Sequence, residues 1–279
     1  MDPITEYDDY RTLTVQVADR IATITLNRPD RRNAFTREMG TELSHAYRVC
    51  DADDNVRVIV LTGTPPAFCG GADLSPGDTT FTAPAADFSA AGVNPPAWRL
   101  RKPVIAAVNG HAIGIGLTLA LQCDLRIMAE DAKYAIPQVR RGILPDAYSH
   151  WTLPRLIGIS RAAQLLLAGT TFDGRQAAAW GLSTQSVPAN QVLDSAYALA
   201  RDLAVNTAPL SVAAAKRLLW STFEHDAAHI GESETALHRT LMSQDDAKEG
   251  VRAYLDRRNP HWTGNLSDFS SPTEIDNQV

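Results

Sequence analysis

Two glycine-containing turns, each directly after a short apolar run, constrain this chain more than any other feature. The first turn, Phe68 to Leu74, follows the run 56–62, and the second, Asn109 to Gly116, follows the run 103–108. Apolar, β-branched runs bounded by glycine are typical of buried strands that end in tight turns. Turns at neighbouring strand ends can direct two backbone N–H groups at one point, which is the construction of an oxyanion hole.

Length, charge and cysteine usage exclude several classes of protein. The chain has 279 residues and is 44% hydrophobic, which is enough for a full core. A net charge of −6 with no long basic block argues against a nucleic-acid partner. We expect no signal peptide and no membrane insertion, because no apolar run reaches membrane-spanning length. Cys50, Cys69 and Cys123 are odd in number and widely spaced, which indicates reduced thiols, no metal site and a cytoplasmic location.

The predicted elements are mixed α/β at first and helical later. The runs 13–17 and 21–26 alternate around a short turn and predict a hairpin. Thr36 can cap a helix, because apolar residues recur after it at helical spacing up to Cys50. Strands, turns and helices then alternate through 56–62, 104–108, 116–121 and 125–128. Amphipathic helices are predicted at 160–168, 173–180, 191–206, 209–223 and 244–256.

At its two glycine turns the chain resembles the enoyl-CoA hydratase/isomerase family, also called the crotonase superfamily. The resemblance covers about 13 to 259 and includes an ordered set of further segments: Ile24 to Pro29, Cys123 to Arg126, Gly142 to Pro145, Arg155 to Gly158, Ala178 to Leu182 and Glu249 to Leu255. It implies an α/β fold, a crotonase-like spiral of repeated ββα units with a C-terminal helical trimerisation region. On this basis, 1–200 form the core with an acyl-CoA site, 201–259 form an oligomerisation region that gives a homotrimer or homohexamer, and 260–279 form a polar, disordered tail.

The resemblance also implies the site residues. The oxyanion donors are the backbone N–H groups of Ala72 and of Ile115, the first residue of a short helix whose N-terminal partial charge helps. Gly114, Thr118 and Gln138 belong to the acyl pocket. The alternative is that both are ordinary tight turns. That alternative does not explain why both turns match the family pattern and occur in the same order.

Coenzyme A is implied as part of the substrate, with no other cofactor. The residues expected to contact it are Arg28, Arg31 and Arg32 after the second strand, Gly70, Asp73 and Leu74 in the first glycine turn, and Tyr254, Arg257 and Arg258 at the last helix. Arginine suits the phosphates of coenzyme A because its guanidinium group pairs with two oxygens at once. For each arginine alone, a solvated surface charge is an equally good interpretation.

The chain departs from the family at the residues that perform acid–base chemistry. Active hydratases place two glutamates where this chain has Thr118 and Gln138, and neither side chain can accept and return a proton near neutral pH. Asp146 remains, and the resemblance places a carboxylate there in isomerases of enoyl thioesters and in a dehalogenase. Burial would raise its pKa towards that of a general base. If Asp146 opens a helix, His150 shares its face, although an Asp after Pro145 is also a good N-cap.

Several functions stay open from the sequence. The favoured hypothesis is double-bond isomerisation in an acyl-CoA, through an enolate held at Ala72 and Ile115, with Asp146 moving the proton. The alternatives are hydration by a variant mechanism, hydrolysis or substitution with Asp146 as nucleophile or base, and non-catalytic acyl-CoA binding. The sequence also predicts that 75–97 form a loop and short helix over the acyl pocket, and that glutamates at Thr118 and Gln138 would raise hydration.

Overall fold

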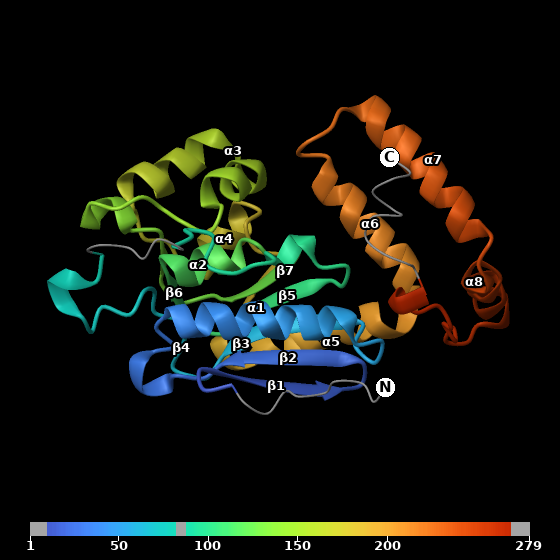
Figure 1. Cartoon of the computed structure of the whole chain (residues 1–279), viewed down its shortest axis with the longest axis horizontal. Helices are drawn as coiled ribbons and strands as arrows, with labels where there is room; N and C mark the ends of the chain where they lie inside the picture. The colour runs from blue at the N-terminus through green and yellow to red at the C-terminus, as the bar shows by residue number, and fades with distance from the viewer. Residues whose placement is uncertain (1–9, 82–87, 269–279) are drawn as a thin grey trace.

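The computed structural model describes residues 10–81 and 88–268, and its core is built on two sheets (Figure 1). The larger sheet has the order β1-β2-β3-β5-β7-β9 and the smaller one the order β4-β6-β8. Among the strand pairs of the described residues, β1 with β2 is antiparallel and the others are parallel. The strands are β1 Leu13–Ala18, β2 Ile21–Leu26, β3 Val58–Gly63, β4 Ala67–Cys69, β5 Val104–Val108, β6 His111–Ile113, β7 Leu125–Ala129, β8 Tyr134–Ala135 and β9 Gln185–Val187.

From β3 to β9, consecutive strands alternate between the two sheets. β3, β5 and β7 lie in the larger sheet, and β4, β6 and β8, which follow them in the chain, lie in the smaller one. Helices α2, Ile115–Ala120, and α3, Ser149–Ala168, follow the second and third of these strand pairs. β3 and β5 are buried along their whole length, as parallel strands covered on both faces require. The predicted α/β fold of ββα units is therefore confirmed.

Two elements that local sequence signals predict are present in the structure. Asp19 and Arg20 both have positive φ, which is the backbone of a tight hairpin turn between β1 and β2. The Thr36 side chain accepts a hydrogen bond from the Met39 N–H at 3.2 Å and caps α1, Arg37–Ala52. The hairpin and the capped helix are thus confirmed.

The helices after the sheet are α4 Gly174–Ala179, α5 Val192–Asn206, α6 Pro209–Ser221, α7 Ala227–Met242 and α8 Asp245–Asp256. α5 packs on β3, β5 and β7 and runs through position 200, so the helical region that stands off the sheet begins at Pro209 (Figure 1). No helix among the described residues is both long and apolar enough to span a bilayer.

A buried lysine joins α6 to the core. The Lys216 ammonium lies 2.7 Å from an Asp124 carboxylate oxygen and donates to the carbonyl groups of Ala97 and Lys102, each at 2.8 Å. Trp220, one helical turn later, donates its indole N–H to the other Asp124 oxygen at 2.7 Å. Because these groups are largely buried, the contacts fix α6 on the core.

The first part of the predicted disordered tail is instead packed against the protein. Trp262 donates its indole N–H to the Val205 carbonyl at 2.9 Å, and the Asp246 carboxylate accepts from the Thr263 N–H at 2.8 Å. Leu266 is buried beside α6. The expectation of disorder is therefore wrong for 260–268, because Trp262 contacts α5 and Leu266 packs against α6. Residues 269–279 lie outside the described residues.

Candidate active site

The two glycine turns meet backbone to backbone. A Cβ on Gly71, whose φ is +103°, would lie 2.9 Å from the Ile113 carbonyl oxygen. A Cβ on Gly116 would lie 2.7 Å from the Cβ of Cys69. No side chain fits at either position without displacing its neighbour, so the glycines allow the strand ends of β4 and β6 and the start of α2 to close together.

The N–H group of Ala72 is directed by its neighbours. Phe35 donates its N–H to the Gly71 carbonyl at 2.7 Å and accepts from the Asp73 N–H at 2.9 Å. Because successive N–H groups of an extended chain point to opposite sides, the Ala72 N–H points away from Phe35. It donates to no residue in the part of the chain that the structure describes.

The Ile115 N–H is the first of α2 and therefore has no partner within the helix. Gly114, with φ of +54°, precedes it and accepts at its carbonyl from the Leu117 and Thr118 N–H groups, each at 3.0 Å. Within residues 10–81 and 88–268, nothing accepts from the Ile115 N–H. The two turns thus supply two available donors, as an oxyanion hole requires.

Three side chains come together beside the second turn. Thr118 donates its hydroxyl to Asp146 Oδ1 at 2.7 Å, and Gln138 donates from Nε2 to the same oxygen at 3.2 Å. A Cβ on Gly114 would lie 3.4 Å from that Gln138 nitrogen. Thr118 is fully buried and Gln138 is 5% exposed. The structure therefore places all four acyl-pocket and carboxylate residues expected from the sequence in one cluster.

Burial sets the electrostatics of this cluster. It raises the pKa of Asp146, and the hydrogen bonds from Thr118 and Gln138 lower that pKa without cancelling the effect of burial. The neighbouring Cys69 thiol is also buried, and its pKa is raised to about 11. Cys69 is therefore a neutral thiol near neutral pH and no nucleophile, which leaves the carboxylate as the proton acceptor of the cluster.

Asp146 does not open a helix. Ala147 and Tyr148 both have positive φ, and α3 begins only at Ser149. This left-handed turn separates the carboxylate from the helix, so Asp146 is not the N-cap and does not share a helical face with His150. His150 is exposed and makes no hydrogen bond with Asp146. The structure therefore does not bring the two predicted catalytic side chains together.

Part of the segment predicted to cover the pocket lies against the oxyanion turn. A Cβ on Gly92 would lie 3.0 Å from Cδ1 of Ile115, and the Ala90 carbonyl accepts from the Ala147 N–H at 2.7 Å. In place of the predicted short helix, the described part of 75–97 contains only 3₁₀ turns, and 82–87 lie outside the described residues. The segment 88–97 thus packs on both the donor turn and the carboxylate loop.

Two of the expected coenzyme A residues neutralise each other. Arg28 Nη2 lies 2.8 Å from Asp73 Oδ2. Hydrogen bonds from Ser75, and after them the one from Arg28, lower the pKa of Asp73 to about 2. Arg31 and Arg32 are exposed and form no ion pair with any residue that the structure describes. Arg31 and Arg32 are therefore the better placed cations for an anionic ligand.

The remaining first-turn residues lie nearby. Gly70 donates its N–H to the Arg32 carbonyl at 2.8 Å, which ties the glycine turn to the arginine turn, and Leu74 is exposed. A buried asparagine that the sequence analysis missed strengthens this connection: Asn33 Oδ1 accepts from the Arg28 N–H, and its amide donates to the Ala67 carbonyl, each at 2.8 Å. Asn33 has a left-handed φ, and the only signal in the sequence was the asparagine itself, a residue type that tolerates this conformation.

The last helix lies far from the cluster within one chain. Figure 1 shows α8 at one end of the molecule and α2 towards the other. Tyr254 is 83% exposed, and Arg257 is exposed with a left-handed φ. Arg258 pairs with Glu249 at 2.6 Å. The structure of a single chain therefore does not bring these three residues to the site around Asp146.

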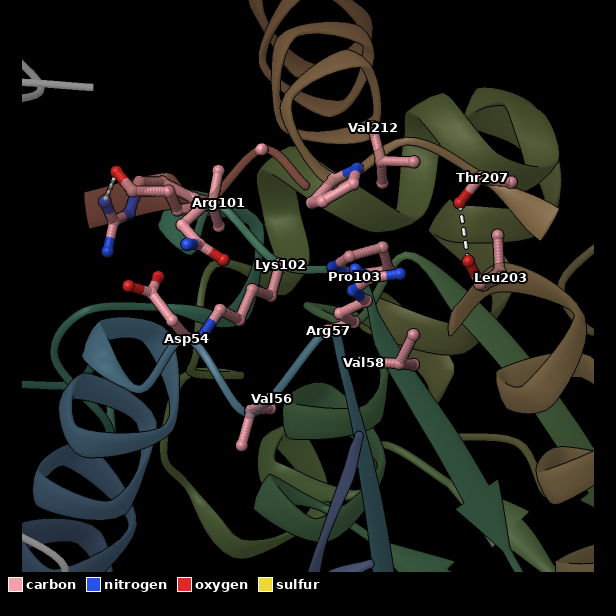
Figure 2. A pocket seen from close by; sticks show the side chains of 14 residues that line it. Asp54, Val56, Arg57, Val58, Arg101, Lys102, Pro103, Leu203, Thr207 and Val212 are labelled. Atoms are coloured by element: carbon pink, nitrogen blue, oxygen red, sulfur yellow. Dashed lines mark hydrogen bonds between the residues drawn. The ribbon is translucent and has the colours of Figure 1, made fainter. Parts of the chain in front are cut away.

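A small cavity at the other end of the sheet is structural. It lies at the amino ends of β3 and β5, has a volume of about 20 Å³, and holds about one water (Figure 2). Its cations are already bonded: Arg57 donates to the Ala204 carbonyl at 3.0 Å, Arg101 pairs with Asp51 at 2.9 Å, and Lys102 donates to the Cys50 carbonyl at 2.7 Å. The cavity is therefore too small to bind a substrate, and its cationic side chains already have hydrogen-bond or ion-pair partners.

A larger cavity of about 450 Å³ lies between α6, α7 and the aromatic side chains Trp98 and Trp151. Trp98 stacks on Trp220 with 5.6 Å between the ring centroids. The Tyr148 ring contacts Trp98 edge-on, with 4.9 Å between the centroids. The residues lining this cavity do not include Asp146. This aromatic cluster, which the sequence analysis missed, supports the loop between Asp146 and α3.

Comparisons with known proteins agree with this arrangement. The sequence model of the enoyl-CoA hydratase/isomerase family matches residues 16–265. Enoyl-CoA hydratase ACTT3 of Alternaria alternata is 38% identical over 257 residues, 91% of this chain and 86% of that protein. The 1,2-epoxyphenylacetyl-CoA isomerase of Escherichia coli strain K12 is 36% identical over 250 residues, 88% of this chain and 95% of that protein.

A solved structure is similar over nearly the same length. The crystal structure of a probable enoyl-CoA hydratase/isomerase from Mycobacterium abscessus has a TM-score of 0.89 and 53% sequence identity, and the match covers 91% of this chain and 99% of that one. The sequence matches and the ββα spiral lead to one conclusion. The chain belongs to the enoyl-CoA hydratase/isomerase family, also called the crotonase superfamily, which is a family of enzymes.

Proposed function

We propose that this enzyme moves a double bond within an acyl-CoA thioester and that Asp146 is its acid–base group. One observation carries the proposal: the carboxylate of Asp146 is hydrogen-bonded to both residues that stand where hydratases have glutamates. The site has kept a proton acceptor although Thr118 and Gln138 cannot serve as one. Burial raises the pKa of this carboxyl group, which makes the carboxylate a stronger base.

The reaction needs one base and one pair of donors. The Asp146 carboxylate takes a proton from the α carbon of a β,γ-unsaturated thioester, and the electrons of that C–H bond pass into a dienolate. The negative thioester oxygen is stabilised by the N–H groups of Ala72 and Ile115. The Asp146 carboxylic acid then returns the proton at the γ carbon. The double bond has moved to the α,β position, and the carboxylate is restored.

Hydration is the second candidate, because several relatives are named enoyl-CoA hydratases. Addition of water by the two-carboxylate route needs an acid and a base on the same water, and in this cluster we assign a single carboxylate. The isomerase among the relatives is named for 1,2-epoxyphenylacetyl-CoA, which differs from the β,γ-unsaturated thioester of this proposal. Hydrolysis and non-catalytic binding are outcomes of the test below.

Binding of the substrate and assembly follow the family pattern in this proposal. Arg31 and Arg32 contact the phosphates of coenzyme A, and a second copy of the chain covers the apolar side chains exposed on α8. Val251, Tyr254 and Leu255 are 61%, 83% and 72% exposed, an amount of apolar surface that favours association. We expect trimers or paired trimers, and sedimentation of a monomer at micromolar concentration would contradict this.

Asp146→Asn tests the reaction. The variant keeps the shape of the side chain and removes the base, so isomerisation of a β,γ-enoyl-CoA should fall by roughly 10²-fold or more. Deuterium incorporation at the α carbon in D₂O should fall with it, while acyl-CoA affinity measured by calorimetry should stay within about twofold. Asp131→Asn, which removes an exposed carboxylate paired with Arg175, is the matched control.

The outcomes separate the alternatives. Unchanged isomerisation in Asp146→Asn contradicts the proposed base. Strong hydration by the unmodified protein, unaffected by this change, favours a variant hydratase. Release of free coenzyme A that depends on Asp146 favours hydrolysis. Tight binding without α-proton exchange for any acyl-CoA favours a binding protein.

A further inference from the structure

We infer that Thr118 and Gln138 are positioning residues that hold Asp146 by one oxygen, Oδ1, and reserve Oδ2 for the proton. The inference rests on the proposed function, because it assigns the acid–base oxygen of that reaction. It gives a role to the two residues that replace the hydratase glutamates: they orient the carboxylate that transfers the proton.

The two hydrogen bonds converge on one atom. The Thr118 hydroxyl lies 2.7 Å and the Gln138 amide nitrogen 3.2 Å from Asp146 Oδ1. No described side chain donates to Asp146 Oδ2. Two donors that come from different elements, α2 and the 3₁₀ turn Gln138–Arg141, prevent the carboxylate from rotating freely. Oδ2 is therefore the oxygen that can exchange a proton with a ligand.

The direction of the Thr118 bond follows from its alternatives. Its hydroxyl oxygen lies 3.3 Å from the Ile115 carbonyl and 2.7 Å from the Asp146 carboxylate. A hydroxyl has one hydrogen, and a bond to a charged acceptor is shorter and stronger than one to a carbonyl. The proton of Thr118 therefore points to Asp146 when that group is ionised.

Gln138 is oriented in the same way. With the amide reversed, its oxygen would face a carboxylate oxygen at 3.2 Å, and two acceptors would repel each other. In the orientation with the nitrogen towards Asp146, Gln138 Oε1 is buried with no donor among the described residues. An unsatisfied buried acceptor destabilises a fold. The chain tolerates this cost at the residue that holds the carboxylate.

Among the described residues, no charged group shifts the pKa of Asp146. Cys69, on β4, has a pKa of about 11 and stays neutral near physiological pH. Arg140, on the same turn as Gln138, donates to the Ala168 carbonyl at 2.6 Å, and neither Arg140 nor the exposed Arg141 forms an ion pair with Asp146. The pKa of Asp146 is thus raised by burial and lowered by the two side-chain donors and by a hydrogen bond from its own backbone N–H. Removal of either donor must raise it further.

Thr118→Val tests the inference, because valine keeps the shape and loses the hydroxyl. The pKa of the Asp146 carboxyl, measured by ¹³C NMR titration with Asp146→Asn as the assignment reference, should rise by about one unit. The acid limb of kcat/KM should move to higher pH by the same amount. Thr118→Ser, which restores the hydroxyl, should return both values. Gln138→Met removes the second donor and should shift them in the same direction if Thr118→Val does not fold.

Failure of this inference differs from failure of the proposed function. If Thr118→Val and Gln138→Met fold and turn over while the carboxyl pKa and the acid limb stay unchanged, the positioning role is overturned. If the unmodified protein exchanges no α-proton yet Thr118→Val raises the pKa and Thr118→Ser returns it, the contact to Oδ1 stands and the reaction is wrong. A merely structural role for Thr118 would change the melting temperature without moving the titration.

Discussion

Gly116 of α2 and Cys69 of β4 are packed so closely that a Cβ on the glycine would lie 2.7 Å from the Cβ of the cysteine. Gly116→Ala should therefore push α2 away from the first glycine turn. We expect a loss of about 1–3 kcal/mol in the free energy of unfolding, as for other overpacked cores. Because α2 also carries the Ile115 N–H, turnover should fall as well. Urea unfolding and steady-state kinetics measure the two effects.

The control is Gly231→Ala. Gly231 lies inside α7 and has no atom within 4 Å of the position that a Cβ would occupy. Alanine favours a helix over glycine by up to about 1 kcal/mol, so this variant should be neutral or more stable. Equal losses in both variants would show that contact with Cys69 does not determine the effect.

Asp146 should reduce stability at neutral pH. Its pKa in the fold is raised above the ordinary 3.8, so the folded chain binds this proton more tightly than the unfolded chain does. Its contribution to stability is fully present below pH 3.8 and is lost as the pH rises through the folded pKa. Asp146→Asn should therefore melt at a higher temperature than the unmodified protein at pH 7, and the difference should shrink in acid. A lower melting temperature at pH 7 would contradict this.

The arginines after β2 should divide into two roles. Arg31→Gln with Arg32→Gln should weaken coenzyme A binding about tenfold, the equivalent of one charge-assisted contact. Binding of dephospho-coenzyme A, which lacks the 3′-phosphate, should change less. Arg28→Gln breaks the 2.8 Å pair with Asp73 and should lower kcat more than affinity, because it loosens the first glycine turn. Calorimetry with both ligands checks the division, and a phosphate-specific loss in Arg28→Gln would overturn it.

The structure changes one expectation about the hydratase positions. The sequence alone predicts that Thr118→Glu with Gln138→Glu raises hydration. Both replaced groups contact Asp146 Oδ1, so three carboxylates would share one site and repel each other. We expect the double variant to lose isomerisation and to gain little hydration, and the further change Asp146→Ala to raise hydration. The loss of enoyl absorbance measures it, and equal hydration by the double and triple variants would contradict the interpretation.

Much of the fold was predictable because its signals are local. β3 and β5 are continuous apolar runs, and Thr36 caps α1 as its position suggests. The start of α3 was missed because the turn at Ala147 and Tyr148 has no glycine to mark it. α7 was missed because it has little apolar surface of its own; of its residues only Ser233 and Leu237 are buried.

The site was predictable in composition and only partly in geometry. From the family resemblance, Thr118, Gln138 and Asp146 were predicted to lie at one pocket. That both donors meet the same carboxylate oxygen depends on how α2 and the turn after β8 pack, and spacing in the sequence does not contain this. The same holds for Arg28, whose charge is neutralised by Asp73, a residue 45 positions away.

The contact of Lys216 with the Ala97 carbonyl joins α6 to the end of the segment 88–97. The same segment touches Ile115 through Gly92 and the carboxylate loop through Ala90. A displacement of α6 must therefore either break the Lys216 contact or carry the covering segment with it. A ligand that moved this segment on binding would therefore also favour one position of the helical region, and each equilibrium would alter the other to the same degree.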